Sequence, residues 1–274
     1  RNGAGKTTTL KSMLNFVKAD KGTCVINGFD VSKDEIKVKE SIGFVSGTDG
    51  FYQTTKIKTI TNVTKKFFDN WNEELYRKLL STFKLDENKK IKELSAGMKI
   101  KYQIALAMCH DAKLLILDEP TSGLDPNQVE EVRALIKEIG QTRTVIISTH
   151  ILSEVEVLCS RVIIISGGEL VADSPTDQLK TRYGNAATVR VCAGATEEQL
   201  KGAFAGISGI QGIEFEKSEK GLAALVSIDG QTEIRPALAK AVFEKGFELF
   251  ELSLQRNSLE DIFHVLTQGA NNDK

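Results

Sequence analysis

The chain combines short, unbroken apolar runs with longer stretches in which apolar residues recur every three or four positions. Residues 114–117 are a run of the first kind, and 144–147 form a second one that is apolar after Thr144. They are too short to be helices here, and they indicate buried parallel strands. The second pattern extends over 57–83, beginning with Ile57 and Ile60. Together the two patterns predict an α/β core with an inserted helical subdomain at about 54–110.

The pattern changes after a polar stretch at 175–184, which we expect to connect two domains, 1–180 and 185–274. A hairpin turning at Gly167-Gly168 precedes this stretch. The later elements follow the order β-α-β-β-α-β-α and predict a small ferredoxin-like α+β domain. Its expected strands are 188–192, 213–215, 222–228 and 247–254, and its expected helices are 197–204, 234–244 and 259–266. This domain carries no catalytic constellation, which favours a dimerisation or regulatory role over ligand sensing.

Two adjacent carboxylates, Asp118 and Glu119, follow the strand at 114–117, and Pro120 then ends it. Ligands of open α/β sheets bind outside the carboxyl ends of the strands. One acid there could hold Mg²⁺ through its water shell while the other polarises an attacking water. Taken alone, the pair is explained equally well as a strand that ends in a charged turn.

A phosphate-binding loop changes that balance. Residues 3–8 read Gly-Ala-Gly-Lys-Thr-Thr, which matches the phosphate-loop template without its first glycine. Gly3 and Gly5 allow backbone N–H groups to close around phosphate oxygens at a helix start. Lys6 would reach the β- and γ-phosphates, and Thr7 would offer its hydroxyl to Mg²⁺. The template's first glycine falls one position before Arg1, so we expect a chain truncated inside this motif.

The loop alone could be an ordinary helix cap, but with Asp118-Glu119 it predicts a nucleotide triphosphatase core. A second candidate anion-binding helix start lies at Ser95 and Gly97, about 20 residues before Asp118. Alone, this segment would be a plain N-cap. Two phosphate-binding helix starts for one nucleotide suggest that each nucleotide is held between two chains, head to tail.

Composition and residue spacing argue against several kinds of partner and site. The formal net charge of −1 gives no signature of a polyanion-binding protein, so we expect no nucleic acid partner. No apolar run reaches about 18 residues, so no segment is expected to span a bilayer. The four cysteines are widely spaced without a CxxC pair, which suits free thiols in a reducing cytosol. The three histidines are scattered along the chain, so no zinc site is expected.

These motifs, in this order, resemble the ATP-binding subunit of ABC transporters over about residues 1–180. Residues 3–8 resemble Walker A, 94–98 the signature loop, 114–119 Walker B, 122–125 the D-loop and 148–150 the switch-histidine segment. The resemblance implies that catalysis rests on Glu119, His150 and Lys6, and that Mg²⁺ is held by Thr7 and Asp118. It implies that ATP is bound by Asn2, Gly3, Ala4, Gly5, Lys6, Thr7, Thr8, Ser95, Gly97 and Asp125, with Ser95 on the opposite subunit's nucleotide.

Two departures from the family pattern stand out. The signature loop has Ala96 and Met98 where Gly and Gln are commonest. Gly47 occupies the position of the Q-loop glutamine, and Gln53, six residues on, is not assigned that role. Both features look like those of ABC-2-type exporter subunits, and the tail at 258–263 is similar to their C-terminal extension.

The resemblance implies a Mg²⁺-dependent ATPase that powers a separate multispanning permease from the cytoplasmic face of the cell membrane. It also implies that the transporter is an exporter. A second ATPase subunit would complete a head-to-tail dimer. Two alternatives stay open. One is a soluble ABC ATPase acting on ribosomes or DNA, although such relatives usually carry tandem cores or a long coiled coil. The other is an inactive fragment with an incomplete phosphate loop.

Overall fold

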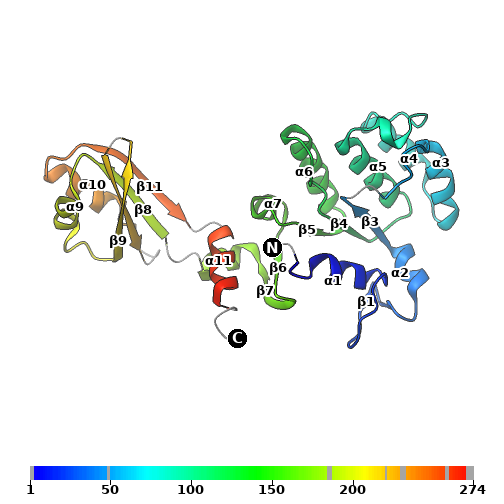
Figure 1. Cartoon of the computed structure of the whole chain (residues 1–274), viewed down its shortest axis with the longest axis horizontal. Helices are drawn as coiled ribbons and strands as arrows, with labels where there is room; N and C mark the ends of the chain where they lie inside the picture. Colours follow the sequence, from blue (N-terminus) through cyan, green and yellow to red (C-terminus); the bar gives the residue numbers. More distant parts are fainter. Residues whose placement is uncertain are drawn as a thin grey trace. The chain divides into compact units, whose positions relative to one another are not determined.

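The structure is a computed structural model that describes residues 3–47, 50–183, 187–219, 221–228, 233–256 and 259–269. It divides into two compact units, Arg1–Leu158 and Cys159–Lys274. The colour bar of Figure 1 gives the residue numbers by which each unit can be located. None of the described helices is long and apolar enough to cross a membrane.

A parallel three-stranded sheet of order β3-β4-β5 forms the centre of the first unit. Its strands are β3 (Ile42–Ser46), β4 (Leu114–Asp118) and β5 (Thr144–Ser148). The register pairs Ser46 with Asp118 and Asp118 with Ser148, so the carboxyl ends of all three strands lie in one row. This row is where ligands of such sheets bind.

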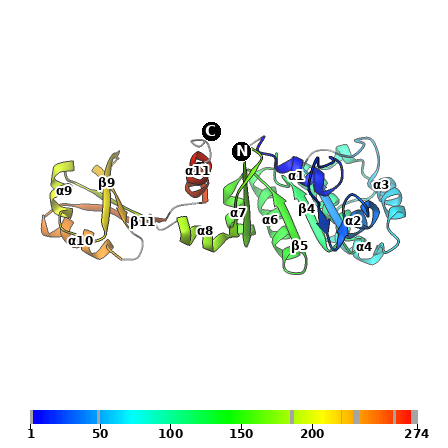
Figure 2. The ribbon, with the colours of Figure 1, turned by 90° about the horizontal axis from the view of Figure 1, so that it is seen from below.

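Helices cover both faces of this sheet, which explains why β4 is apolar at consecutive positions. Leu115 and Leu117 pack among residues of α5 (Ala96–Met108) and α6 (Pro126–Gly140). Ile116 packs in a different cluster, with Leu10 of α1 (Lys6–Met13). Helix α1 lies beside β4 (Figure 2). The same layer contains β1 (Val25–Ile26), β2 (Phe29–Asp30) and α2 (Glu35–Ser41).

A helical block is inserted between β3 and β4, as the apolar spacing predicts. It consists of α3 (Ile57–Thr64), η1 (Lys65–Phe67), α4 (Glu73–Thr82), η2 (Ile91–Glu93) and part of α5. Its buried core holds a hydroxyl cluster in which Thr61 Oγ1 lies 2.7 Å from Tyr76 Oη and 3.0 Å from Tyr102 Oη. Burial raises the pKa of Tyr76 to about 12, so its hydroxyl stays neutral. The block therefore has its own core.

The second unit begins with the hairpin of β6 (Arg161–Ser166) and β7 (Glu169–Pro175). The turn at Gly167 and Gly168 is confirmed, since both residues have positive φ, at 58° and 83°. A tight two-residue hairpin turn of this kind favours glycine because side chains are strained at positive φ.

The expected polar connection at 175–184 is wrong, because a helix, α8 (Thr176–Tyr183), occupies most of it. Thr176 starts this helix by donating its hydroxyl to Cys159 O at 2.7 Å. Leu179 is buried, and α8 packs with the final helix, α11 (Leu259–Gly269), which also contacts β7. The predicted domain boundary at 180–185 stays a prediction, whereas the compact units divide after Leu158.

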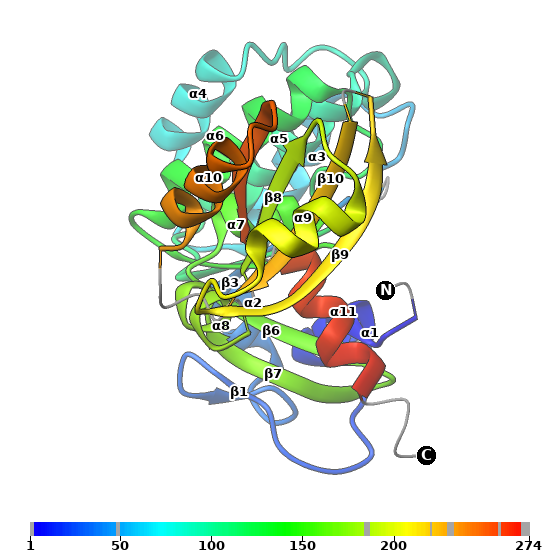
Figure 3. The same ribbon diagram turned by 90° about the vertical axis from the view of Figure 1, so that its left-hand side faces the viewer.

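The rest of the second unit is a four-stranded antiparallel sheet of order β11-β8-β10-β9. The chain runs through β8 (Ala187–Ala193), α9 (Glu197–Phe204), β9 (Ile210–Ser218), β10 (Gly221–Ile228), α10 (Arg235–Glu244) and β11 (Leu249–Arg256). Both helices lie on the same face of the sheet (Figure 3). This arrangement is ferredoxin-like, as predicted from the order of elements.

Candidate nucleotide site

The loop before α1 has the backbone of an anion-binding turn. Gly3 and Gly5 have φ of 79° and 105°, in the left-handed region that favours glycine. Gly5 O accepts hydrogen bonds from Thr9 N at 2.8 Å and Thr9 Oγ1 at 2.9 Å, which fixes the first turn of α1. A Cβ on Gly3 would meet nothing within 4 Å, so the loop opens to solvent there. Open backbone at a helix N-terminus suits a phosphate group.

Asp118 lies at the centre of the row of strand ends. Its Oδ1 accepts a hydrogen bond from Ser148 Oγ at the end of β5, and Thr7 Oγ1 lies 3.4 Å from the same oxygen. A carboxylate beside a hydroxyl is a donor set that Mg²⁺ accepts when phosphates and waters complete its shell. Over the described ranges, no group of three His, Cys, Asp or Glu side chains is placed to hold a metal ion.

Glu119 turns away from the sheet directly after β4. Its φ is 50°, an uncommon value for a residue with a side chain. Glu119 N donates to Ser148 O at 2.9 Å, and Ser122 N donates to Glu119 O at 3.2 Å. The Glu119 carboxylate then lies beside the imidazole of His150, with 3.3 Å between Oε1 and Nδ1. Both side chains are partly exposed, so a water can reach them.

A buried ion pair holds the segment that carries His150. Thr149 Oγ1 donates to Glu154 Oε2 at 2.9 Å and accepts from Ile151 N at 3.0 Å. The Glu154 side chain is only 1% exposed, and its Oε1 lies 3.5 Å from Arg133 Nη2 on α6. No local pattern predicts this support, because nothing in the sequence distinguishes Glu154 from the exposed Glu156 on the same helix, α7 (Leu152–Leu158).

The second predicted helix start is bound to α6. Ser95 is the N-cap of α5, and its Oγ accepts from Met98 N at 3.2 Å. Gly97 N donates to Gln128 Oε1 at 3.2 Å. Asp125 caps α6 by accepting from Gln128 N at 3.0 Å. The first-turn donors at Gly97 and Met98 are therefore already paired within the chain, and Gln128 is a contact that the sequence analysis missed.

Comparisons with known proteins agree with this geometry. Residues 1–122 match the family described as "ABC transporter". The chain is 33% identical over 274 residues to the bacitracin transport ATP-binding protein BcrA of Bacillus licheniformis, covering 98% of this chain and 87% of that protein. The chain belongs to the ABC transporter ATP-binding proteins. It is also 28% identical to the linearmycin resistance ATP-binding protein LnrL of Bacillus subtilis, covering 97% of this chain and 87% of that protein.

Solved ABC structures share the fold. The structure of an ATP-binding subunit of an ABC transporter has a TM-score of 0.60 and 26% identity, covering 67% of this chain and 79% of that one. The ATP-binding cassette MJ0796, solved as a dimer bound to ADP and Pi, has a TM-score of 0.54 and 19% identity, covering 64% of this chain and 82% of that one. The α/β nucleotide-binding fold predicted from the sequence is thus confirmed.

Within this ABC subunit, the predicted site residues fall into two groups. The phosphate loop and strand ends contribute Gly3, Ala4, Gly5, Lys6, Thr7, Thr8, Asp118, Glu119 and His150. The signature loop and D-loop contribute Ser95, Gly97 and Asp125. Asn2 lies outside the described residues. The individual roles of these residues stay predictions.

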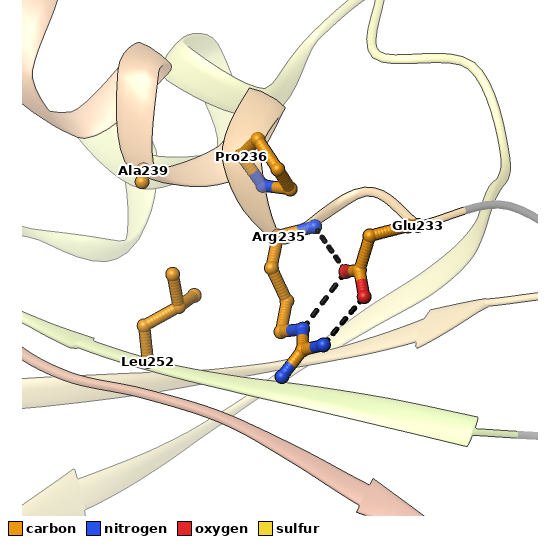
Figure 4. Close-up of a pocket in the computed structure, with 5 residues that line it drawn as sticks. All are labelled: Glu233, Arg235, Pro236, Ala239 and Leu252. Atoms are coloured by element: carbon orange, nitrogen blue, oxygen red, sulfur yellow. Dashed lines mark hydrogen bonds and ion pairs between the residues drawn. The ribbon is translucent and has the colours of Figure 1, made fainter.

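The second unit contains a shallow hollow of about 420 Å³ lined by Glu233, Arg235, Pro236, Ala239 and Leu252. Figure 4 shows Arg235 turned back onto Glu233, and the ion pair holds the pKa of the Glu233 carboxyl at about 2. The guanidinium is occupied by this partner, and the remaining lining is apolar.

Proposed function

We propose that this chain is the ATP-binding and ATP-hydrolysing subunit of an ABC-2-type exporter. The observation that carries the proposal is the set of contacts at one edge of the sheet, where Thr7 lies near Asp118 and Glu119 lies beside His150. Membership in the ABC transporter ATP-binding proteins supports ATP as the nucleotide that binds there. Hydrolysis would power a separate membrane permease.

Each residue at this edge has a distinct part in hydrolysis. The backbone around Gly3 and Gly5 and the Lys6 ammonium would bind the phosphates, while Thr7 and Asp118 would hold Mg²⁺. When bound, Mg²⁺ would neutralise phosphate charge. Glu119 takes a proton from water as the water oxygen bonds to the γ-phosphorus and the bond to the bridging oxygen breaks. His150 orients the Glu119 carboxylate through its Nδ1.

Two partners follow from this proposal. A second ATPase subunit presents its Ser95 and Gly97 to the nucleotide, so that the head-to-tail pair encloses two ATP molecules. A multispanning permease carries the transported molecule and holds the ATPase at the cytoplasmic face of the membrane. The direction of transport is supported by the relatives, whose names describe bacitracin transport and linearmycin resistance.

Affinity capture from the native cell tests the transport part of the proposal. The tagged chain is extracted in mild detergent, and its partners are identified by mass spectrometry. We expect a multispanning membrane protein in stoichiometric amount. Recovery of ribosomal proteins in its place would favour the non-transport alternative, and recovery of neither partner would contradict the transporter assignment.

A further inference from the structure

Gly47, at the family's Q-loop glutamine position, lies against the backbone that carries Glu119. It follows Ser46, the last residue of β3, and its N–H donates to Asp118 O at 2.8 Å. A Cβ built on Gly47 would lie 2.3 Å from Glu119 O and 3.1 Å from both Asp118 O and Glu119 C. All three atoms belong to the main chain, so no rotamer change can make room.

The close approach coincides with the unusual backbone of Glu119. Its φ of 50° turns the chain sharply after β4, and its N–H is held on the opposite side by Ser148 O at 2.9 Å. The Glu119 peptide is therefore confined between the ends of β3 and β5. Because the hydrogen bond to Ser148 fixes one side, the missing side chain at position 47 provides the space on the other. Strained backbone of this kind persists only where its surroundings enforce it.

We propose that Gly47 is a positioning residue for Glu119. The absent side chain admits the left-handed turn that places the Glu119 carboxylate 3.3 Å from His150 Nδ1. This inference rests on the proposed function, in which Glu119 accepts a proton from the attacking water. In this chain a side chain at position 47 would displace the Glu119 main chain, so adding one impairs hydrolysis.

Steady-state hydrolysis of Mg-ATP by Gly47→Ala and Gly47→Gln tests the inference. A misplacement of about 1 Å in a catalytic group costs about 10²-fold in rate, so we expect kcat to fall on that scale. KM and the Kd for a fluorescent ATP analogue should change little, because Thr7 and Lys6 are untouched. Gly50→Ala is the matched control, since a Cβ there meets nothing within 4 Å. Equal or higher activity of Gly47→Gln would overturn the inference, as would a loss caused by failed ATP binding.

A double-mutant cycle shows whether Gly47 acts through Glu119. In single-turnover assays, Gly47→Ala should add no further loss to Glu119→Gln, because the positioned group is already removed. Multiplicative losses would place the effect of Gly47 elsewhere and overturn the proposal.

Melting temperatures test the predicted steric clash at position 47 without a measurement of hydrolysis. Gly47→Ala should melt several degrees below the parent chain, whereas Gly50→Ala should melt with it. If the parent does not hydrolyse ATP, the proposed function fails while this comparison still stands. Equal melting temperatures for the two variants would overturn the steric basis of the inference.

Discussion

Replacing Glu154 by Ala should both destabilise the first unit and slow ATP turnover. The Glu154 carboxylate is 1% exposed and is shared between Thr149 Oγ1, at 2.9 Å, and the Arg133 guanidinium, at 3.5 Å. Its removal leaves a guanidinium that is mostly buried and a loop hydroxyl without its acceptor. Since Thr149 precedes His150, the loop that carries the imidazole loses its fixed point.

The magnitude follows from the environment of the pair. Removing one partner of a buried ion pair costs about 3–5 kcal/mol. Two features place the cost for this pair at the lower end of that range. Arg133 keeps a second partner, Glu130, at 2.9 Å. In addition, Arg133 Nε and Glu154 Oε1 are buried without a hydrogen-bond partner in the part of the chain that the structure describes. A loss of about 3 kcal/mol lowers the melting temperature of a unit this size by about 6–12 °C.

Calorimetry on Glu154→Ala measures this loss, and Asp173→Ala is the matched control. Asp173 pairs with Arg161 at 2.7 Å through the same chemistry, but this pair is exposed on the β6–β7 hairpin. Water and salt screen such pairs, so the control should melt close to the parent. Equal shifts of the melting temperature in both variants would show that burial does not set the energy of the Arg133–Glu154 pair.

Two further predictions concern a hydrogen bond at the signature loop and a buried imidazole. Gln128→Ala frees the Gly97 N–H, and because one such bond contributes about 0.5–1.5 kcal/mol, ATP-driven dimerisation should need up to about tenfold less ATP. Gel filtration of Gln128→Ala in a Glu119→Gln background measures this, and an unchanged midpoint would show that Gln128 does not compete with the nucleotide. Burial lowers the pKa of His110, whose ring contacts Ile42 O at 3.0 Å, so the unfolded chain takes up the proton first as pH falls. The free energy of unfolding, measured by urea titration, should therefore decline as the pH falls from about 6.5 toward 5.5. The variant His110→Gln should show a smaller decline. An equal decline in both chains would exclude His110 as its source.

The sequence predicted the parts of the fold that local patterns dictate. The run at 114–117 predicted a buried strand, because four consecutive apolar residues need cover on both faces, and α1 and α5 provide it. The two glycines at 167 and 168 likewise specified their hairpin turn. The ferredoxin-like order followed from the alternation of short elements.

Other features depend on tertiary distances that no local pattern encodes. Helix α8 forms from a polar stretch because Leu179 is buried where α8 packs with α11. Glu154 is buried although its neighbours on α7 include exposed glutamate. The roles of Ser148 beside Asp118 and of Gly47 beside Glu119 emerge only once three strand ends are aligned. Motif spacing located the candidate site, but not the residues that support it.

The most direct test of the account is Mg²⁺-dependent ATP hydrolysis by the parent chain and by Glu119→Gln, with Glu138→Gln on the exposed side of α6 as control. General-base catalysis contributes about 10²–10⁴-fold, so turnover by Glu119→Gln should fall by that factor while ATP binding persists and a dimer accumulates. The control should match the parent. Undiminished steady-state hydrolysis by Glu119→Gln would remove Glu119 from the role assigned to it and contradict the account.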